Sequence, residues 1–198
     1  MYLIFDCSGI SKPLSWKAPF SDTFNWPRMI HLSWIILDKE LNPIDDFDHI
    51  IIPEGFSFNA DIEKRCRIDK EDISTKGAKL EDVLKGFDKS LQQVDYIFAH
   101  NLNFNENVLA AEYLRKGISH SLFRKESFCL MQESTFFCKL PSKTGGYKWP
   151  TLTELHSIIF KKAYSPPNNA RADVIAATRC FKALMMGGQF EDLFDLED

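Results

Sequence analysis

The sequence lacks the features that place a protein in a membrane, a secretory route or a zinc-binding family. None of its apolar runs approaches the ~20 residues that a transmembrane helix needs. The amino-terminal segment has no basic region and reaches Asp6 before any long apolar run, which argues against a signal peptide. The 5 cysteines are widely scattered and include no CxxC pair, so we expect neither a zinc site nor a disulfide framework. We therefore expect reduced thiols and a cytoplasmic location, with no membrane contact.

An excess of positive charge is also missing. The chain has 24 Lys and Arg against 28 Asp and Glu, a formal net charge of −4, and its pI is about 5.8. Such a protein does not coat nucleic acid non-specifically, although a local basic groove is compatible with this charge. Hydrophobic residues make up 44% of the 198 residues, which is enough for a substantial core. We expect one domain over residues 1–186, followed by an acidic tail over residues 187–198.

The apolar patterns predict that strands come first and then alternate with helices. Strands are expected at residues 2–6, 29–37, 47–52, 96–99 and 128–131, with the second and third antiparallel. Helices are expected at residues 59–67, 80–94, 104–116, 132–138, 151–160 and 170–186. Residues 11–27 form a long loop, of the kind that is usually functional. This order predicts an α/β fold with a mixed central sheet flanked by helices.

Polar side chains gather at three places where an element begins or ends. Asp6 closes the first strand, "FAHNLNFNENVL" (98–109) forms a strand-to-helix turn, and "PPNNARADVIAATRCF" (166–181) leads into the last helix. Together with "WPRMIHLSW" (26–34) and "YKWPTLTEL" (147–155), these segments resemble the DnaQ-like 3′–5′ exonucleases, the DEDDh branch of the ribonuclease H-like superfamily. The resemblance covers nearly the whole chain and implies that family's fold.

The resemblance also implies a set of site residues. In the family, a strand ends in Asp-x-Glu, a second motif reads approximately His-Asn-x-x-Phe-Asp, and a third places His five residues before Asp. Asp6 and Asp173 match the first and last of these acids, whereas Ser8, Asn105 and Asn168 stand where the family has Glu, Asp and His. The family's four acids hold two divalent ions that activate water and stabilise the leaving oxygen. Its His serves as the general base.

Replacing two acids and the histidine is expected to weaken both metal binding and catalysis strongly. A unit-charge pair at about 4 Å is worth about 4 kcal/mol at an effective dielectric constant of about 20. Losing a general base costs about 10²–10⁴ in rate. We therefore expect no tightly bound cofactor, with Mg²⁺ or Mn²⁺ on Asp6 and Asp173 only where residual activity persists. Glu106, next to Asn105, does not replace the missing acid because one residue along a helix turns a side chain by about 100°.

Basic and aromatic residues flank the expected site. The expected nucleic-acid contacts are Lys12, Trp16, Lys17, Arg28, His100, Asn101 and Lys148. Basic residues interleaved with aromatic ones hold single strands by phosphate contact and base stacking. The alternatives are a structural hydrogen bond for His100, a helix cap for Asn101, and core or loop anchoring for the tryptophans.

Three functions follow as hypotheses. The first is a pseudo-exonuclease that binds single-stranded 3′ ends or a protein partner without efficient cleavage. The second is an active exonuclease with a single metal ion on Asp6 and Asp173, and the third is a protein-interaction scaffold. In the tail, Gln189, Leu193 and Phe194 loosely resemble a sliding-clamp-binding peptide. The alternative for the tail is a terminus whose phenylalanines pack on the domain.

Overall fold

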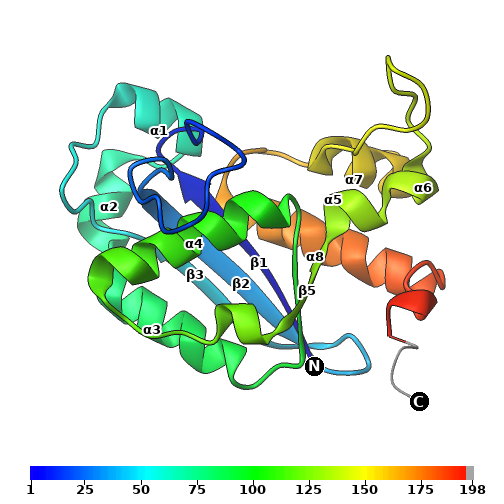
Figure 1. The fold of residues 1–198 in the computed structure, drawn as a ribbon, viewed down its shortest axis with the longest axis horizontal. Coiled ribbons are helices and arrows are strands. Elements are labelled where there is room, and N and C mark those ends of the chain that lie inside the picture. The colour runs from blue at the N-terminus through cyan, green and yellow to red at the C-terminus, as the bar shows by residue number, and fades with distance from the viewer. Residues whose placement is uncertain (195–198) are drawn as a thin grey trace.

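The apolar runs of the sequence form one five-stranded sheet with the strand order β3-β2-β1-β4-β5 (Figure 1). The computed structural model describes residues 1–194. Its strands are β1 (Tyr2–Gly9), β2 (Met29–Leu37), β3 (Pro43–Ile50), β4 (Tyr96–Ala99) and β5 (Glu126–Cys129). Its α-helices are α1 (Ala60–Cys66), α2 (Lys70–Lys76), α3 (Leu80–Leu91), α4 (Leu102–Lys116), α5 (Leu130–Glu133), α6 (Thr135–Cys138), α7 (Leu152–Phe160) and α8 (Ala170–Met186). Two 3₁₀ turns are η1 (Leu122–Arg124) and η2 (Glu191–Leu193).

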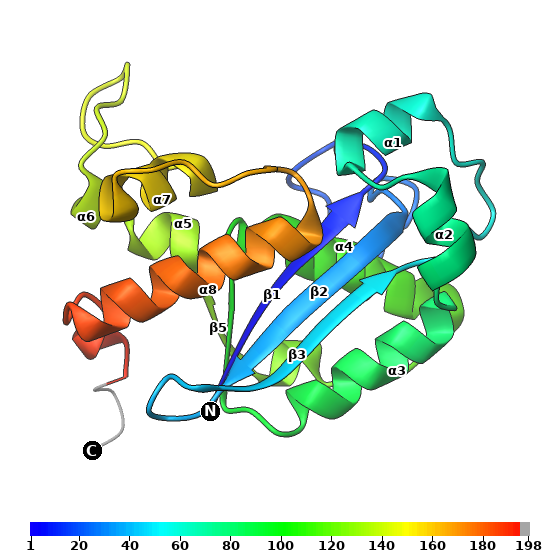
Figure 2. The same cartoon turned by 180° about the vertical axis from the view of Figure 1, so that it is seen from behind.

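The sheet is mixed and lies between two helical layers. β2 pairs antiparallel with both β1 and β3, whereas β4 pairs parallel with β1 and β5. Helices α3 and α4 cover one face, and α8 crosses the other face beside α7 (Figures 1 and 2). Each layer buries its own apolar cluster against the sheet. The predicted α/β architecture, a mixed central sheet flanked by helices, is confirmed.

Sheet topology determines where a ligand site can form. After β1 the chain continues to β2 on one side, whereas after β4 it passes through α4 to β5 on the other side. Neighbouring parallel strands whose connections run in opposite directions leave a crevice at their carboxyl ends. β1 pairs with β4 only from Tyr2 to Ile4. The second half of β1 therefore carries Asp6 and Ser8 into this crevice.

Several element boundaries differ from the sequence prediction. β1 continues to Gly9 because Cys7 and Ser8 still pair with β2, so Asp6 lies within the strand. β3 begins at Pro43, since its exposed first residues pair with β2 without an apolar pattern to reveal them. α2 was not predicted because it buries no residue and shows no apolar period.

The helix predicted at 132–138 and the strand predicted at 128–131 also need correction. The chain forms β5 two residues earlier than expected and turns directly into α5 at Leu130. Ser134 then separates α5 from α6, and its hydroxyl bonds back to the carbonyl of Leu130. A Ser hydroxyl bonded to the carbonyl four residues earlier is known to bend helices, which accounts for two short helices in place of one.

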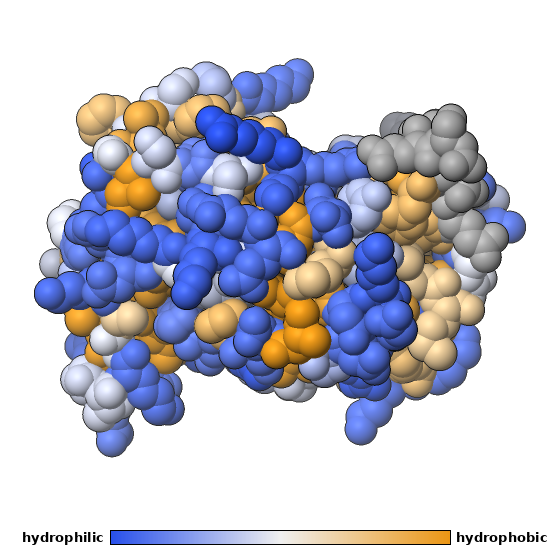
Figure 3. All heavy atoms as spheres, turned by 90° about the horizontal axis from the view of Figure 1, so that it is seen from below, coloured by the Kyte–Doolittle hydropathy of each residue, from blue (hydrophilic) through white to orange (hydrophobic). Residues whose placement is uncertain are grey.

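The end of the chain packs on the domain over the residues that the structure describes. Phe190 is buried, and the Phe194 ring lies 5.0 Å from that of Tyr96 and 5.7 Å from that of Tyr2. Leu193 also packs on this cluster. This packing agrees with the alternative interpretation of the tail, a terminus whose phenylalanines pack on the domain. Residues 195–198 lie outside the part of the chain that the structure describes. Figure 3 shows the molecule from below the view of Figure 1, a face on which hydrophilic side chains surround separate apolar patches.

Among the described residues, no helix combines the length and apolar character that crossing a bilayer requires.

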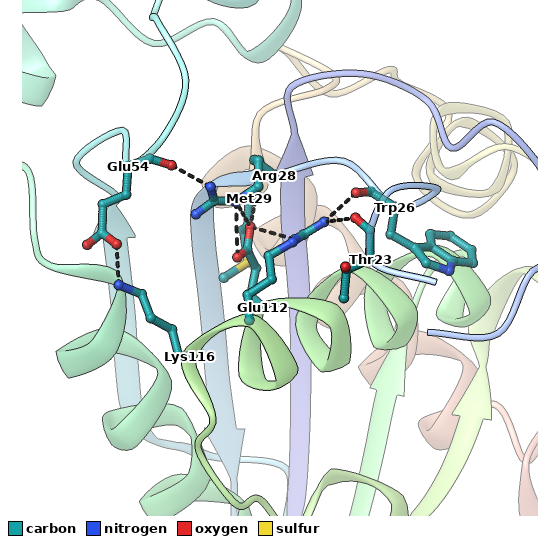
Figure 4. Close-up of polar contacts among 8 residues, drawn as sticks. Thr23, Trp26, Arg28, Met29, Glu54, Glu112 and Lys116 are labelled. Carbon is teal, nitrogen blue, oxygen red and sulfur yellow. Dashed lines mark hydrogen bonds and ion pairs between the residues drawn. The ribbon is translucent and has the colours of Figure 1, made fainter. Parts of the chain in front are cut away.

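A buried carboxylate attaches the long loop over residues 11–27 to α4 (Figure 4). Glu112 is fully buried and accepts hydrogen bonds from Arg28 Nε (2.9 Å) and from the first backbone N–H of β2 (2.8 Å). Arg115, one turn further along α4, forms an ion pair with Glu112 (3.0 Å) and donates to the carbonyls of Thr23 and Trp26. Two arginines thus share the single negative charge of Glu112, and one of them, Arg115, fixes both ends of the loop's last turn.

Candidate functional site

A cleft of about 790 Å³ opens at the carboxyl end of β1. Its walls come from β1, from α1, from the amino-terminal ends of α4, α7 and α8, and from the loop before α8. All five positions matched to the exonuclease motifs line this cleft: Asp6, Ser8, Asn105, Asn168 and Asp173. Three segments that are far apart in the sequence therefore meet at one place, as the motif resemblance predicts.

The Asn105 amide is held in a single orientation. Its Oδ1 accepts the backbone N–H of Cys7 (2.7 Å), while its Nδ2 donates to Asp6 Oδ1 (3.3 Å) and to the carbonyls of His100 (3.0 Å) and Asn101 (3.3 Å). Turning the amide over would place an oxygen against three acceptors and an NH₂ against a donor. Asn105 therefore presents hydrogen-bond donors, and no oxygen, to the space beside Asp6.

The side chain of Ser8 and the backbone of Asn168 both help to form the start of α8. Ser8 Oγ accepts the backbone N–H of Ala170 (3.2 Å), one of the first N–H groups of α8 that no carbonyl within the helix can satisfy. Asn168 adopts a left-handed backbone conformation (φ 64°), which Asn tolerates better than most residues. The helix itself begins after Asn169, whose side chain accepts from Ala172 N–H (3.2 Å). The two positions shape the start of α8.

Asp6 and Asp173 form a carboxyl pair with raised pKa values. Burial, followed by the charge of Asp173, raises the pKa of Asp6 well above its usual range. Burial also raises the pKa of Asp173 to about 6, although hydrogen bonds from the Tyr164 hydroxyl (2.6 Å) and the Asn168 backbone oppose the shift. Two carboxyls that repel each other titrate as a pair, so the site holds less than two full negative charges near neutral pH.

The raised pKa values predict how stability changes with pH. A carboxyl whose pKa is higher in the folded state than the ~4 of the unfolded chain favours folding while it is protonated. Stability should therefore fall as pH rises from about 4 through about 6. Because Asp173 is partly exposed, we expect on the order of 1–2 kcal/mol. Denaturant titrations at a series of pH values measure this loss.

The matched variant for this measurement is Asp173→Asn. Its amide oxygen still accepts the Tyr164 hydroxyl, but it carries no charge to repel Asp6. The variant removes the part of the stability change between pH 4 and pH 6 that Asp173 causes and leaves the part that the burial of Asp6 causes, so the change should become smaller without vanishing. An unchanged pH dependence would show that the carboxyl pair does not cause it.

The cleft includes some of the expected nucleic-acid contacts and leaves out others. Lys12, Trp16, His100 and Asn101 line it, and the Trp16 ring lies 6.0 Å from the Phe104 ring at one wall. Burial lowers the pKa of His100 to about 4, and its Nε2 lies 3.1 Å from the carbonyl of Pro150. His100 is therefore neutral at neutral pH and has the structural hydrogen bond that the alternative expects. Asn101 begins α4, in a left-handed conformation and without a side-chain cap.

Lys17, Arg28 and Lys148 are not among the residues that line the cleft. Arg28 forms an ion pair with the buried Glu112 carboxylate, so its role is to stabilise the fold. Lys148 forms an ion pair with Glu154. Lys17 lies in the long loop with an exposed side chain. Only tertiary structure separates these three from Lys12, because all four have the same chemical character in the sequence.

The structure also brings in residues that the sequence reasoning missed. Lys64, Arg65 and Arg67 from α1 and its C-cap line the cleft opposite α4. Arg65 Nε donates to the carbonyl of Gly9 (3.2 Å), and Arg67 Nε donates to that of Pro167 (3.1 Å). The segment "EKRCR" (63–67) was the available signal, but nothing in the sequence placed this helix beside β1. Tyr164, which lines the cleft and donates to Asp173, corresponds to no motif position and could not be found from the sequence.

Three further titratable side chains near Asp6 are engaged in other contacts or buried: Glu106, His156 and Cys7. Glu106 bonds to Ser127 of β5 and points away from the cleft, as its helical position predicts. His156 is buried, with its Nδ1 2.7 Å from the carbonyl of Lys162. Burial raises the pKa of the Cys7 thiol well above its usual range, which makes it a filler and no nucleophile. The titratable acids in the cleft lining are Asp6, Asp61 and Asp173, and its histidine is His100.

The donor set does not fit the paired divalent ions of the exonuclease motifs. Two hard cations need several anionic oxygens converging on one space. Within residues 1–194, no group of three or more His, Cys, Asp or Glu side chains is arranged to hold a metal ion. The amide of Asn105 faces the site with its NH₂ group, and the hydroxyl of Ser8 is bonded to α8.

Solved structures of exonucleases share this fold. The zinc-bound form of an Escherichia coli exonuclease I–single-stranded DNA complex aligns with a TM-score of 0.69 and 18% identity, over 98% of this chain and 42% of that chain. Exonuclease I from Methylocaldum szegediense aligns with a TM-score of 0.72 and 14% identity, over 98% of this chain and 42% of that chain. A 3′-exonuclease that recognises the 3′ end of a histone mRNA stem-loop aligns with a TM-score of 0.70 and 16% identity, over 94% of this chain and 82% of that chain.

The chain spans about two fifths of the length of the exonuclease I chains that it matches. No protein-family model and no curated protein matches the sequence. At these identities the comparison establishes the fold, and the activity has to be argued from the site.

Proposed function

We propose that this protein is a DnaQ-like 3′–5′ exonuclease-family member with degenerate DEDDh motifs, which binds single-stranded nucleic acid in the cleft without hydrolysing it efficiently. Residues 1–186 form its single domain. The observation that carries the proposal is the orientation of Asn105. Its NH₂ group donates to Asp6 at the place where the family pattern requires a carboxylate. A divalent ion beside Asp6 would face the partly positive hydrogens of the Asn105 NH₂ group instead of an oxygen ligand.

The charge of the cleft supports nucleic acid as the ligand. Four cationic side chains line it: Lys12, Lys64, Arg65 and Arg67. Across the described residues, no carboxylate forms an ion pair with any of the four. The three carboxyls in the lining are Asp61 and the Asp6–Asp173 pair, whose raised pKa values reduce its charge. The cleft is therefore locally basic in a chain whose net charge is −4.

Phosphate can approach this cleft without a metal ion. The α1 cations lie across the cleft from the amino-terminal end of α4, and the Trp16–Phe104 ring pair offers a face for a base. The proteins of similar fold include exonuclease I in complex with single-stranded DNA and a 3′-exonuclease that recognises a histone mRNA stem-loop, which supports a nucleic-acid 3′ end as the ligand proposed for this cleft. Mg²⁺ or Mn²⁺ binds Asp6 and Asp173 weakly on this proposal. The five free thiols support a reducing compartment such as the cytoplasm.

The proposal is tested with labelled single-stranded DNA and RNA, in EDTA and in Mn²⁺. We expect a mobility shift under both conditions and no shortened products in Mn²⁺. A ladder of products would overturn the proposal in favour of an active exonuclease. Absence of any shift would overturn it in favour of a protein-interaction scaffold.

Charge reversal in the cleft gives a sharper measurement. The double substitution Lys12→Glu and Lys64→Glu should weaken binding by about 10- to 100-fold and reduce the salt dependence of the affinity by about one unit of slope per lost phosphate contact. The matched control is the double substitution Lys39→Glu and Lys89→Glu, which changes the net charge equally at two exposed lysines outside the cleft lining. Fluorescence anisotropy at several salt concentrations measures both quantities. Equal losses in the control and the cleft variant would mean that net charge, and not the cleft, holds the strand.

A further inference from the structure

A basic and aromatic segment projects from the domain beside the cleft. It comprises α6 and the loop that follows, residues 135–149, and is called the aromatic projection below. Figure 1 shows its loop extending away from the body of the molecule between α6 and α7. Four aromatic side chains in it are exposed: Phe136, Phe137, Tyr147 and Trp149. Such side chains are costly to leave in water without a partner, so a cluster of them marks a contact surface.

The rings are held on a fixed support. Pro141 and Tyr147 form a β-bridge, and the backbone N–H of Lys148 donates to the carbonyl of Leu140 (2.9 Å). The turn between them uses Gly145 and Gly146, both with positive φ (93° and 70°), a conformation that side chains disfavour. The Tyr147 ring lies 6.1 Å from the Phe136 ring, nearly perpendicular to it. A platform that is already ordered loses little conformational entropy when a flat ligand stacks on it.

The charge of the aromatic projection indicates which kind of planar ligand would stack on its rings. The sequence from Thr135 to Trp149 contains Lys139, Lys143 and Lys148 and no acidic residue. Lys148 pairs with Glu154 of α7, while no carboxylate in the described part of the chain forms an ion pair with the other two. Exposed rings alternating with cations match a single strand, whose bases stack while its phosphates meet the lysines.

The aromatic projection is continuous with the cleft. Trp149 is followed by Pro150, whose carbonyl contacts His100 at the cleft wall (3.1 Å), and by Thr151 to Thr153, which line the cleft. We propose that a single strand whose end lies in the cleft continues over the aromatic projection, with successive bases stacked on Tyr147 and Trp149. This inference rests on the proposed function and adds a second, stacking subsite to it.

A length series separates the two subsites. Fluorescence anisotropy is measured with oligonucleotides from about 2 to about 16 nucleotides, a range that covers known single-strand site sizes. For the parent, affinity should rise as the strand becomes long enough to reach the aromatic projection. In Tyr147→Ala and Trp149→Ala, long strands should bind about 5- to 100-fold more weakly, the loss expected for one stacked base, while the shortest strands bind as in the parent.

Two further variants control for the chemistry. Trp149→Phe keeps a stacking ring, so it should retain most of the affinity while losing the tryptophan quenching that a long strand causes beyond that of a short strand, since Trp16 remains in the cleft. Phe24→Ala removes an aromatic ring that is 94% exposed but lies outside the aromatic projection, and its affinity should match the parent at every length. Thermal unfolding checks that the exposed substitutions leave the fold intact.

The outcomes distinguish this inference from the proposed function. If short strands bind and the Tyr147 and Trp149 variants bind long strands like the parent, the stacking subsite is wrong while nucleic-acid binding in the cleft stands. The aromatic projection would then be a surface for a protein partner. If no strand of any length binds the parent, the proposed function fails and the subsite fails with it.

Discussion

Replacing Ser8 by glutamate, Asn105 by aspartate and Asn168 by histidine together is expected to give the protein a divalent-metal site that the parent lacks. The three substitutions introduce the acids and the histidine that the exonuclease motifs have at the matched positions, and these positions line the same cleft as Asp6 and Asp173. Each carboxylate added beside a dication contributes several kcal/mol of attraction in a partly desolvated site. We expect Mn²⁺ affinity, measured by titration calorimetry, to rise by at least about 100-fold, or about 2.7 kcal/mol.

The single substitution Asn105→Asp isolates the decisive position. It removes the donor that now serves Asp6 and the carbonyls of His100 and Asn101, and it places a carboxylate against these acceptors. Without metal at pH 7, we expect a loss of about 2–4 kcal/mol in unfolding free energy, which Mn²⁺ should partly restore. Equal Mn²⁺ affinity in the parent and the triple variant would contradict the account of the site.

Substitution of Glu112 by alanine is expected to have the largest effect on stability. The carboxylate is fully buried and forms ion pairs with Arg28, which directly follows the loop over residues 11–27, and with Arg115, which donates to two carbonyls of that loop. Removing one member of a buried charge network typically costs about 3–5 kcal/mol because it leaves uncompensated charge. Denaturant titration should show this loss, and limited proteolysis should cut the loop faster than in the parent.

Two variants control for cavity formation and surface charge. Glu112→Gln keeps the size of the side chain but not its charge, so a large loss there as well assigns the effect to electrostatics. Glu81→Gln breaks an exposed pair with Lys85 on α3, and we expect less than about 0.5 kcal/mol from it. A Glu112→Ala loss no larger than the Glu81→Gln loss would show that the network does not fix the loop.

The order of the elements and the location of the site were accessible from the sequence. Periodicity placed β2, β4 and α8 at their observed bounds, and the strand-to-helix motifs placed Asp6, Asn105 and Asp173 together. These features follow from local patterns, because burial of one face repeats along a strand or helix. The polar element α2 escaped prediction because nothing in it is buried.

The chemistry of individual side chains was not accessible in the same way. Arg28 and Lys12 are both basic residues near the expected site in the sequence, yet Arg28 forms an ion pair with Glu112 whereas Lys12 lines the cleft. Lys64 and Arg67 reach the cleft only because α1 docks beside the end of β1.

By itself, the sequence determined which groups are present near the end of β1: two carboxyls, two asparagines and a serine. Tertiary structure decided what those groups can do, because an amide is a donor or an acceptor according to the neighbours that fix its orientation. The Cys7 N–H and the His100 and Asn101 carbonyls turn the Asn105 oxygen away from Asp6. The two carbonyls are close to Asn105 in the sequence, whereas Cys7 is 98 residues away and reaches Asn105 only because the chain folds.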